Sequence, residues 1–139
     1  MIPEGVPGYI GAMAGYSGTP LPRKLGIREH SRVRLLAAPE GFARSLGVVP
    51  RARGEADLIV AFFISRARLA KELSGLRAAL DPAGGLWIAW PKRASGVATD
   101  LDENIVREIG LGERLVDNKV CAIDDVWSGL RFVVRVKDR

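Results

Sequence analysis

Two short segments that are apolar throughout constrain the fold of this chain more than any other feature. They are Leu58–Ile64 (LIVAFFI) and Leu86–Trp90 (LWIAW). A strand that is apolar on both faces belongs in the interior of a parallel sheet with helices on each side. The segment between them, Arg66–Leu80, places its leucines at the four- and three-residue spacing of an amphipathic helix. Strand, helix and strand in this order predict an α/β fold.

Weaker patterns extend this unit in both directions. Ser17–Ile27 predicts a short helix, with Thr19 as its N-cap and Pro20 in its first turn. Near the C-terminus, alternating apolar and charged residues predict a hairpin whose turn lies around Asp125–Gly129. We therefore expect a Rossmann-like, mostly parallel sheet with a C-terminal antiparallel hairpin. The other expected elements are a strand at Val33–Ala37, a helix from Thr99 to Gly110, and hairpin strands at Val120–Asp124 and Leu130–Lys137.

The length of the chain fits one domain. Its 139 residues suffice for a single core of ordinary size. Residues 1–15 carry glycine and proline without helix or strand period, which predicts an N-terminal arm ahead of a single α/β domain at residues 16–139. The longest apolar run falls far short of the roughly 20 residues that cross a membrane. The first residues also lack the basic start of a secretory signal, so we expect a cytoplasmic protein without membrane contact.

Cysteine and histidine are too few for several kinds of site. Cys121 and His30 are the only residues of their types, which excludes an internal disulfide and leaves no ligand set for zinc. His30 lacks an accompanying nucleophile motif of the GxSxG type. We therefore expect no metal and nominate no catalytic residue.

A candidate binding site follows the Leu86–Trp90 strand. Lys92 comes directly after this strand and Pro91, where open α/β sheets bind their ligands, and its compact charge suits an anion. Ser95 and Thr99 could add hydroxyl groups, and a helix that begins at Thr99 would add free N–H groups. Two structural explanations remain open: Lys92 extends into solvent, and Thr99 only caps a helix.

Five further residues are candidates for ligand binding. Tyr16, Ser17 and Thr19 precede a helix and could close over a ligand or merely cap it. Glu40 lies in the turn after the first expected strand. Trp127 falls in the expected hairpin turn, an unusual place for a large aromatic residue unless it folds back over the sheet or faces a partner.

A basic cluster suggests a different kind of partner. The chain carries a net charge of +5, and several cations crowd residues 23–34. Such a cluster can bind nucleic-acid phosphates, but it lacks the interleaved aromatic residues of a single-strand binder. Solvated surface charge is the favoured interpretation, and nucleic acid the less favoured partner. The cluster consists of Arg23, Lys24, Arg28, Arg32 and Arg34, with Glu29 among them.

Four motifs give the chain a family resemblance. They are GYSGTPL at Gly15–Leu21, LAAPEGF at Leu36–Phe42, WPK at Trp90–Lys92 and VDNKVCAIDDVWSGLRFVV at Val116–Val134. They resemble an uncharacterised bacterial family catalogued as domain of unknown function 3052, over nearly everything from Gly15 onward. The resemblance implies no activity. The order of elements also looks like a shortened class I methyltransferase fold, in which the terminal hairpin supplies the antiparallel strand.

The turn after the first expected strand departs from enzymes of that architecture. They place a glycine-rich turn there so that the backbone can approach a cofactor closely. This chain has Ala37, Ala38, Pro39, Glu40 and Gly41 instead. The proline removes an N–H donor and the glutamate would repel an anion. We therefore expect the cofactor site to be absent or altered, and no cofactor is assigned.

Three functions from different classes remain after these observations. The first is a small, non-catalytic binding or regulatory module whose crevice near Lys92 holds an anionic small molecule or a protein segment, with a homo-oligomer left open. The second is a divergent methyltransferase-like enzyme, for which binding of S-adenosylmethionine would be decisive. The third is a nucleic-acid binder that works through the basic cluster, with affinity that falls steeply with salt. The first function requires the fewest specialised residues, so it is the function that we expect.

Overall fold

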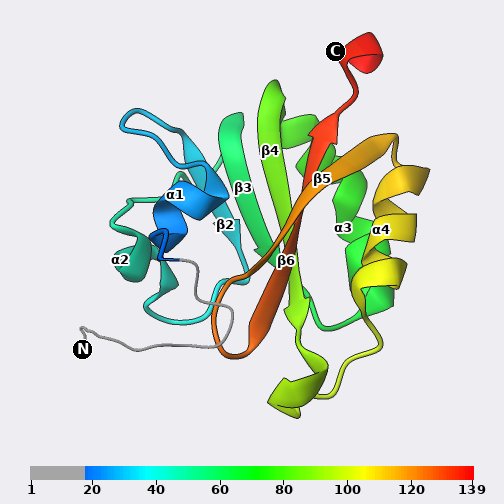
Figure 1. Cartoon of the computed structure of the whole chain (residues 1–139). Coiled ribbons are helices and arrows are strands. Elements are labelled where there is room, and N and C mark those ends of the chain that lie inside the picture. Colours follow the sequence, from blue (N-terminus) through cyan, green and yellow to red (C-terminus); the bar gives the residue numbers. More distant parts are fainter. Residues whose placement is uncertain (1–17) are drawn as a thin grey trace.

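A five-stranded mixed sheet forms the centre of the molecule (Figure 1). The structure is a computed structural model, and it describes residues 18–139. The strand order is β2-β3-β4-β6-β5, in which β2, β3 and β4 run parallel and β6 runs antiparallel to both β4 and β5. The strands are β2 (Val33–Leu36), β3 (Ala56–Phe62), β4 (Leu80–Pro91), β5 (Leu115–Ala122) and β6 (Trp127–Val134).

Helices cover both faces of this sheet. The short helices α1 (Leu21–Leu25) and α2 (Phe42–Leu46) lie on one face, and α3 (Arg66–Ala79) and α4 (Glu103–Gly112) lie on the other (Figure 1). Two 3₁₀ turns, Arg93–Ser95 and Val136–Asp138, complete the described elements. None of the helices within residues 18–139 is long and apolar enough to span a bilayer. The predicted α/β fold with a C-terminal antiparallel hairpin is confirmed.

The two apolar segments of the sequence build two cores, because their side chains alternate between the faces of the sheet. On the α3 side, Ile59, Ile88 and Phe132 pack with Leu69 and Leu73 of the helix. The α1 side holds a second cluster in which Trp87 is fully buried. Its indole Nε1–H donates to the carbonyl oxygen of Leu25 at 2.9 Å, which fixes α1 on the sheet.

Several predicted boundaries were wrong. The last helix begins at Glu103 with Asp102 as its cap, three residues after the cap predicted at Thr99. The N-cap position of α1 is Pro20 instead of Thr19. The hairpin turn is shorter than expected, so Trp127 begins strand β6. The predicted arm at residues 1–15 lies outside the described residues.

Strand β4 begins six residues earlier than predicted and contains a bulge. Leu80 pairs with Ala56, and Gly85 pairs with Leu58. Between these two pairs the chain advances five residues along β4 but only two along β3. The extra residues swing Asp81 outward beside Arg32, just before β2. Gly84 and Gly85, which precede the predicted start of the strand, are buried parts of it.

Arg32 binds carboxylates at the amino ends of the parallel strands. Its Nη2 lies 2.7 Å from Asp57 Oδ1 and 3.1 Å from Asp81 Oδ2, and Nη1 lies 3.6 Å from Glu55 Oε1. Hydrogen bonds from the Arg32 side chain and backbone hold the pKa of Asp57 below its usual value. Arg34 Nη1 donates to the carbonyl oxygen of Gly54. The basic cluster predicted from the sequence therefore has one cation neutralised by carboxylates of the protein itself.

Candidate functional site

A cavity opens at the carboxyl ends of β2 and β3, at the edge where open α/β sheets bind ligands. Its volume is about 500 Å³. We call it the carboxyl-edge cavity. It is lined by Leu36, Ala37, Phe62, Phe63, Ile64, Ser65, Arg68 and Trp127.

A row of aromatic rings reaches this cavity, and two of its members, Phe62 and Trp127, lie in the lining. Phe62 lies edge-on between Phe42 and Trp127, with ring centroids 5.0 Å apart in each pair and interplanar angles of 81° and 89°. Phe42 and Phe62 are buried, whereas Trp127 is half-buried. Trp127 therefore folds back over the sheet and presents part of its ring to the cavity.

The backbone directly after β2 has an unusual conformation. Ala37 adopts φ 56°, in the left-handed region that glycine occupies at little cost. Gly41, at the other end of the same turn, has φ 83°. A non-glycine residue pays about 1 kcal/mol or more for such a conformation, and strained residues of this kind concentrate at functional sites. The turn therefore has at Ala37 a backbone conformation typical of glycine, although the residue is alanine.

The polar groups at this edge are largely occupied by one another. Ser65 Oγ accepts the N–H of Arg68 at 3.2 Å and caps α3. Asp100 Oδ1 accepts the N–H of Arg66 at 2.7 Å, so a carboxylate of the protein already lies at the start of α3. The Arg68 side chain is 64% exposed, and its Nε lies 3.3 Å from Glu72 Oε2. Arg68 is thus a largely exposed cation in the lining of the carboxyl-edge cavity.

The residues predicted around Lys92 lie next to a neighbouring cavity. The Lys92 N–H donates to the Val126 carbonyl at 2.7 Å, and the residue is half-buried outside the linings of the described cavities. Ser95 Oγ donates to the Lys92 carbonyl at 2.7 Å and accepts the N–H of Val97. Thr99 lines the neighbouring cavity, of about 510 Å³, and its hydroxyl donates to the Ile64 carbonyl at 2.7 Å.

The prediction that a helix start beside Thr99 favours an anion was therefore wrong. Asp102 accepts the N–H of Ile105 at 2.9 Å and caps α4, and Glu103 follows in the first turn. Two carboxylates consequently lie where free N–H groups were expected beside Thr99. This end of α4 disfavours an anion, because like charges repel.

Of the other predicted site residues, Glu40 and Thr19 lie outside the lining of the carboxyl-edge cavity. Glu40 is exposed and lines a separate cavity of about 490 Å³ on the outer side of β2. Thr19 is half-buried just before α1. Tyr16 and Ser17 lie outside the described residues. Among the predicted residues that the structure describes, only Trp127 lines the carboxyl-edge cavity.

Sequence reasoning missed most of the lining because it is apolar. Leu36, Phe62 and Ile64 were interpreted as strand residues of the core, which accounts for them without a ligand. Their position in the sequence could have identified them, because all three residues lie within two residues of the carboxyl end of a parallel strand. The left-handed conformation of Ala37 has no signature in the sequence.

The sheet order, the two helical layers and the terminal hairpin define a methyltransferase-like α/β fold. The chain is similar to a SAM-dependent methyltransferase from Aquifex aeolicus, with a TM-score of 0.61, 14% identity, and 81% of this chain matched to 87% of the other. It is also similar to Aeropyrum pernix fibrillarin, solved with natively bound S-adenosyl-L-methionine, with a TM-score of 0.52, 15% identity, and 86% of this chain matched to 70% of the other. At these identities the similarity shows the fold.

Other matched proteins are considerably longer. The chain spans 42% of magnesium protoporphyrin IX methyltransferase from Synechocystis. No protein-family model and no curated protein matches the sequence. The resemblance to the bacterial family of unknown function therefore stays a prediction.

The structural similarities correct the expected function. A non-catalytic binding module was the expectation, and it is contradicted by the similarities in fold to SAM-dependent methyltransferases. What these similarities show of the alternative is its methyltransferase-like fold.

Proposed function

We propose that the chain is a divergent methyltransferase-like protein that binds S-adenosylmethionine in the carboxyl-edge cavity. The observation that carries this proposal is the position of the cavity. It lies at the carboxyl ends of parallel strands, in a fold that matches nearly the whole of a SAM-dependent methyltransferase. When bound, S-adenosylmethionine supplies an electrophilic methyl group to a nucleophilic acceptor.

The lining suits the apolar and cationic parts of this cofactor. Leu36, Phe62 and Trp127 offer apolar and aromatic surface of the kind that buries a flat adenine ring. The ring of Trp127 can also attract a sulfonium cation through its face. Arg68 is free to swing toward the carboxylate of the methionine portion, because its pairing with Glu72 is exposed and weak.

The ribose portion would be held differently from the usual pattern. Enzymes of doubly wound architecture use a carboxylate after a second strand for the ribose hydroxyls. Within residues 18–139, β2 is the edge of the sheet, and the cavity lining contains no carboxylate. Ser65 is the hydroxyl in the lining, and it already caps α3. We therefore expect weaker binding than in enzymes that carry the acid.

Calorimetric titration of the full chain with S-adenosylmethionine tests the proposal. Trp127→Ala should weaken binding about tenfold or more, equivalent to about 1.4 kcal/mol, because it removes the exposed part of the aromatic row. Arg68→Gln should weaken it several-fold. Arg66→Gln is the matched control, since Arg66 lies in the same helical turn outside the lining and should bind like the wild type.

Two outcomes would contradict the proposal. One is the absence of any heat of binding for the wild-type chain. The other is equal affinity for wild type, Trp127→Ala and Arg68→Gln, which would place the ligand elsewhere.

The cytoplasmic location and the homo-oligomer stay predictions. Light scattering of the purified chain tests the oligomeric state.

A further inference from the structure

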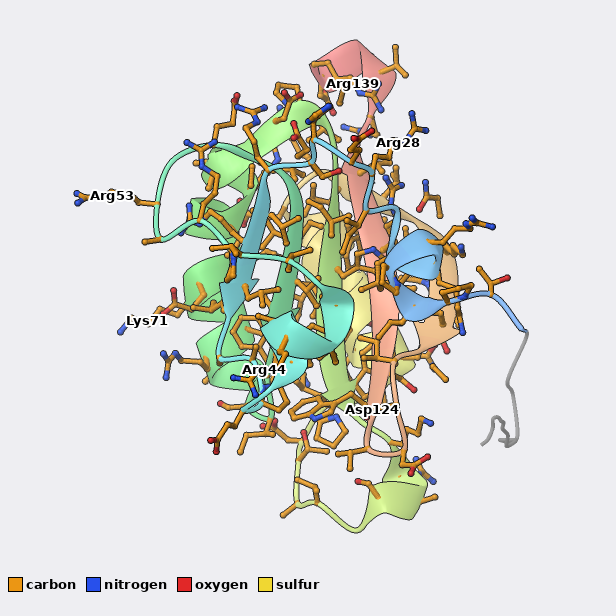
Figure 2. All side chains as sticks on the ribbon, turned by 90° about the vertical axis from the view of Figure 1, so that its left-hand side faces the viewer. Arg28, Arg44, Arg53, Lys71, Asp124 and Arg139 are labelled. Carbon is orange, nitrogen blue, oxygen red and sulfur yellow. The ribbon has the colours of Figure 1, made fainter. Side chains whose placement is uncertain are left out.

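A second cavity lies at the opposite end of the sheet. Its volume is about 710 Å³, and it opens among the segment after α1, the amino ends of β3 and β4, and strand β6. We call it the amino-edge cavity. Figure 2 labels Arg28 at this end of the molecule and Asp124 at the other. Its lining consists of Gly26, Arg28, Glu29, His30, Ser31, Asp57, Leu58, Asp81, Ala83, Gly84 and Arg131.

Arg131 is the unusual residue of this lining. It is half-buried, and within residues 18–139 no carboxylate lies within 4.0 Å of it. Its guanidinium donates from Nη1 to Asn118 Oδ1 at a long 3.3 Å. Burial lowers the pKa of the Arg131 guanidinium, and no opposite charge offsets this effect. A cation that is partly desolvated without a counter-ion costs stability.

Gly85 provides space for this guanidinium. A Cβ at position 85 would lie 2.6 Å from both Nε and Nη2 of Arg131, closer than real side chains approach. The absence of a side chain at Gly85 therefore lets the guanidinium lie against the backbone of β4. On the same face, Arg131 pairs across the hairpin with Lys119, whose like charge adds to the cost.

The acidic residues of the cavity are already occupied. Both oxygens of Asp57 accept hydrogen bonds from Arg32. Asp81 accepts from Arg32 through Oδ2 and from the N–H of Ala83 through Oδ1. Glu29 is exposed and has no ion pair among the described residues. The cations left without a carboxylate are Arg28, which is exposed, and Arg131, which is not.

We propose that the amino-edge cavity binds a small anion carrying a phosphate or carboxylate group, held by the guanidinium of Arg131 with Arg28 at the rim. A guanidinium offers a planar fork of donors that matches both groups. The anion would supply the counter-charge that Arg131 lacks in the protein. The site lies at the other end of the sheet from the carboxyl-edge cavity, so it is independent of the proposed cofactor.

Titrations at constant ionic strength, followed by NMR through the Nε–H resonance of Arg131, test the proposal. Inorganic phosphate is one probe and succinate is the other, and the tighter of the two identifies the preferred group. We expect a saturable shift of this resonance in the wild-type chain. Arg131→Gln should lose at least about tenfold in affinity, measured by calorimetry, which corresponds to about 1.4 kcal/mol.

Three variants separate binding from a structural role. Arg53→Gln is the control, because Arg53 projects into solvent away from the cavity (Figure 2) and should bind like the wild type. Gly85→Ala keeps the charge but displaces the guanidinium, so it should weaken binding as well. Arg131→Gln should unfold at the same denaturant concentration as the wild type or a higher one, and should bind S-adenosylmethionine unchanged.

The proposal is overturned if neither anion shifts the Arg131 resonance of the wild type. It is also overturned if Arg131→Gln binds both anions as tightly as the wild type. A marked loss of stability in Arg131→Gln would assign this residue a structural role instead.

Discussion

Replacing Gly110 by alanine should destabilise the protein, although alanine is the better helix former. Gly110 lies in α4 and is buried against Phe132, a fully buried residue of β6. An added Cβ would lie 2.2 Å from Phe132 Cε1 and 2.4 Å from Cζ, whereas carbon atoms pack at about 3.5 to 4.0 Å. The helix or the ring must therefore move by more than about 1 Å.

The magnitude follows from two opposing effects. Alanine in a helix interior is favoured over glycine by about 0.5 to 1 kcal/mol. Overpacking a well-filled core costs about 1 to 3 kcal/mol, and so severe an overlap places Gly110 at the upper end. We expect Gly110→Ala to lower the free energy of unfolding by about 2 kcal/mol.

Urea denaturation of the full chain measures this change. Gly75→Ala in α3 is the matched control, because no heavy atom lies within 4 Å of an added Cβ there. That variant should gain about 0.5 to 1 kcal/mol. Equal gains for both variants would refute the reasoning, since they would mean that α4 does not pack on Phe132 as closely as described.

Two further predictions concern single carboxylates. Asp57 has a lowered pKa because Arg32 binds it, so its contribution to stability is present above the unfolded-state pKa of about 4 and is lost as the pH falls through the folded-state pKa. Asp57→Asn should therefore be less stable than wild type at pH 7, and the difference should shrink in acid melts; a constant difference would contradict the ion pair. Asp102→Ala removes the cap that accepts the Ile105 N–H and should cost about 1 kcal/mol in urea melts, whereas no loss would mean that the start of α4 is held by other contacts.

The fold was predictable in the segments where apolar residues alone determine the secondary structure and its burial. Leu58–Ile64 and Leu86–Trp90 can only be buried on both faces, so their place in the sheet follows from composition alone. Helix starts were harder, because several residues can cap. Thr99 and Asp102 both fit the pattern, and the choice depends on Thr99 donating to Ile64, a contact with a residue far away in the sequence. The bulge before Gly85 likewise depends on contacts with β3 and Arg32.

The site was less predictable than the fold. The rule for open sheets pointed to the edge where the carboxyl-edge cavity lies, but the residues chosen were polar and the lining of this cavity is mostly apolar. Polar side chains such as Ser95 attract attention in a sequence, although here their hydrogen bonds are made with the adjacent backbone. Arg131 shows the reverse problem, since an arginine on an alternating strand is normally a solvent-facing residue. Only the packing against Gly85 distinguishes it.

The segment between β4 and α4 is fastened to the start of α3 at two points, and this has a consequence for local unfolding. Thr99 donates to the Ile64 carbonyl, and Asp100 accepts the N–H of Arg66, each at 2.7 Å. Opening this segment exposes the first amide of α3 and loosens the start of α4 in the same event. Amide hydrogens at the beginnings of both helices should therefore exchange with solvent at a common rate, as parts of one cooperative unit, while those of β3 and β4 exchange only on global unfolding.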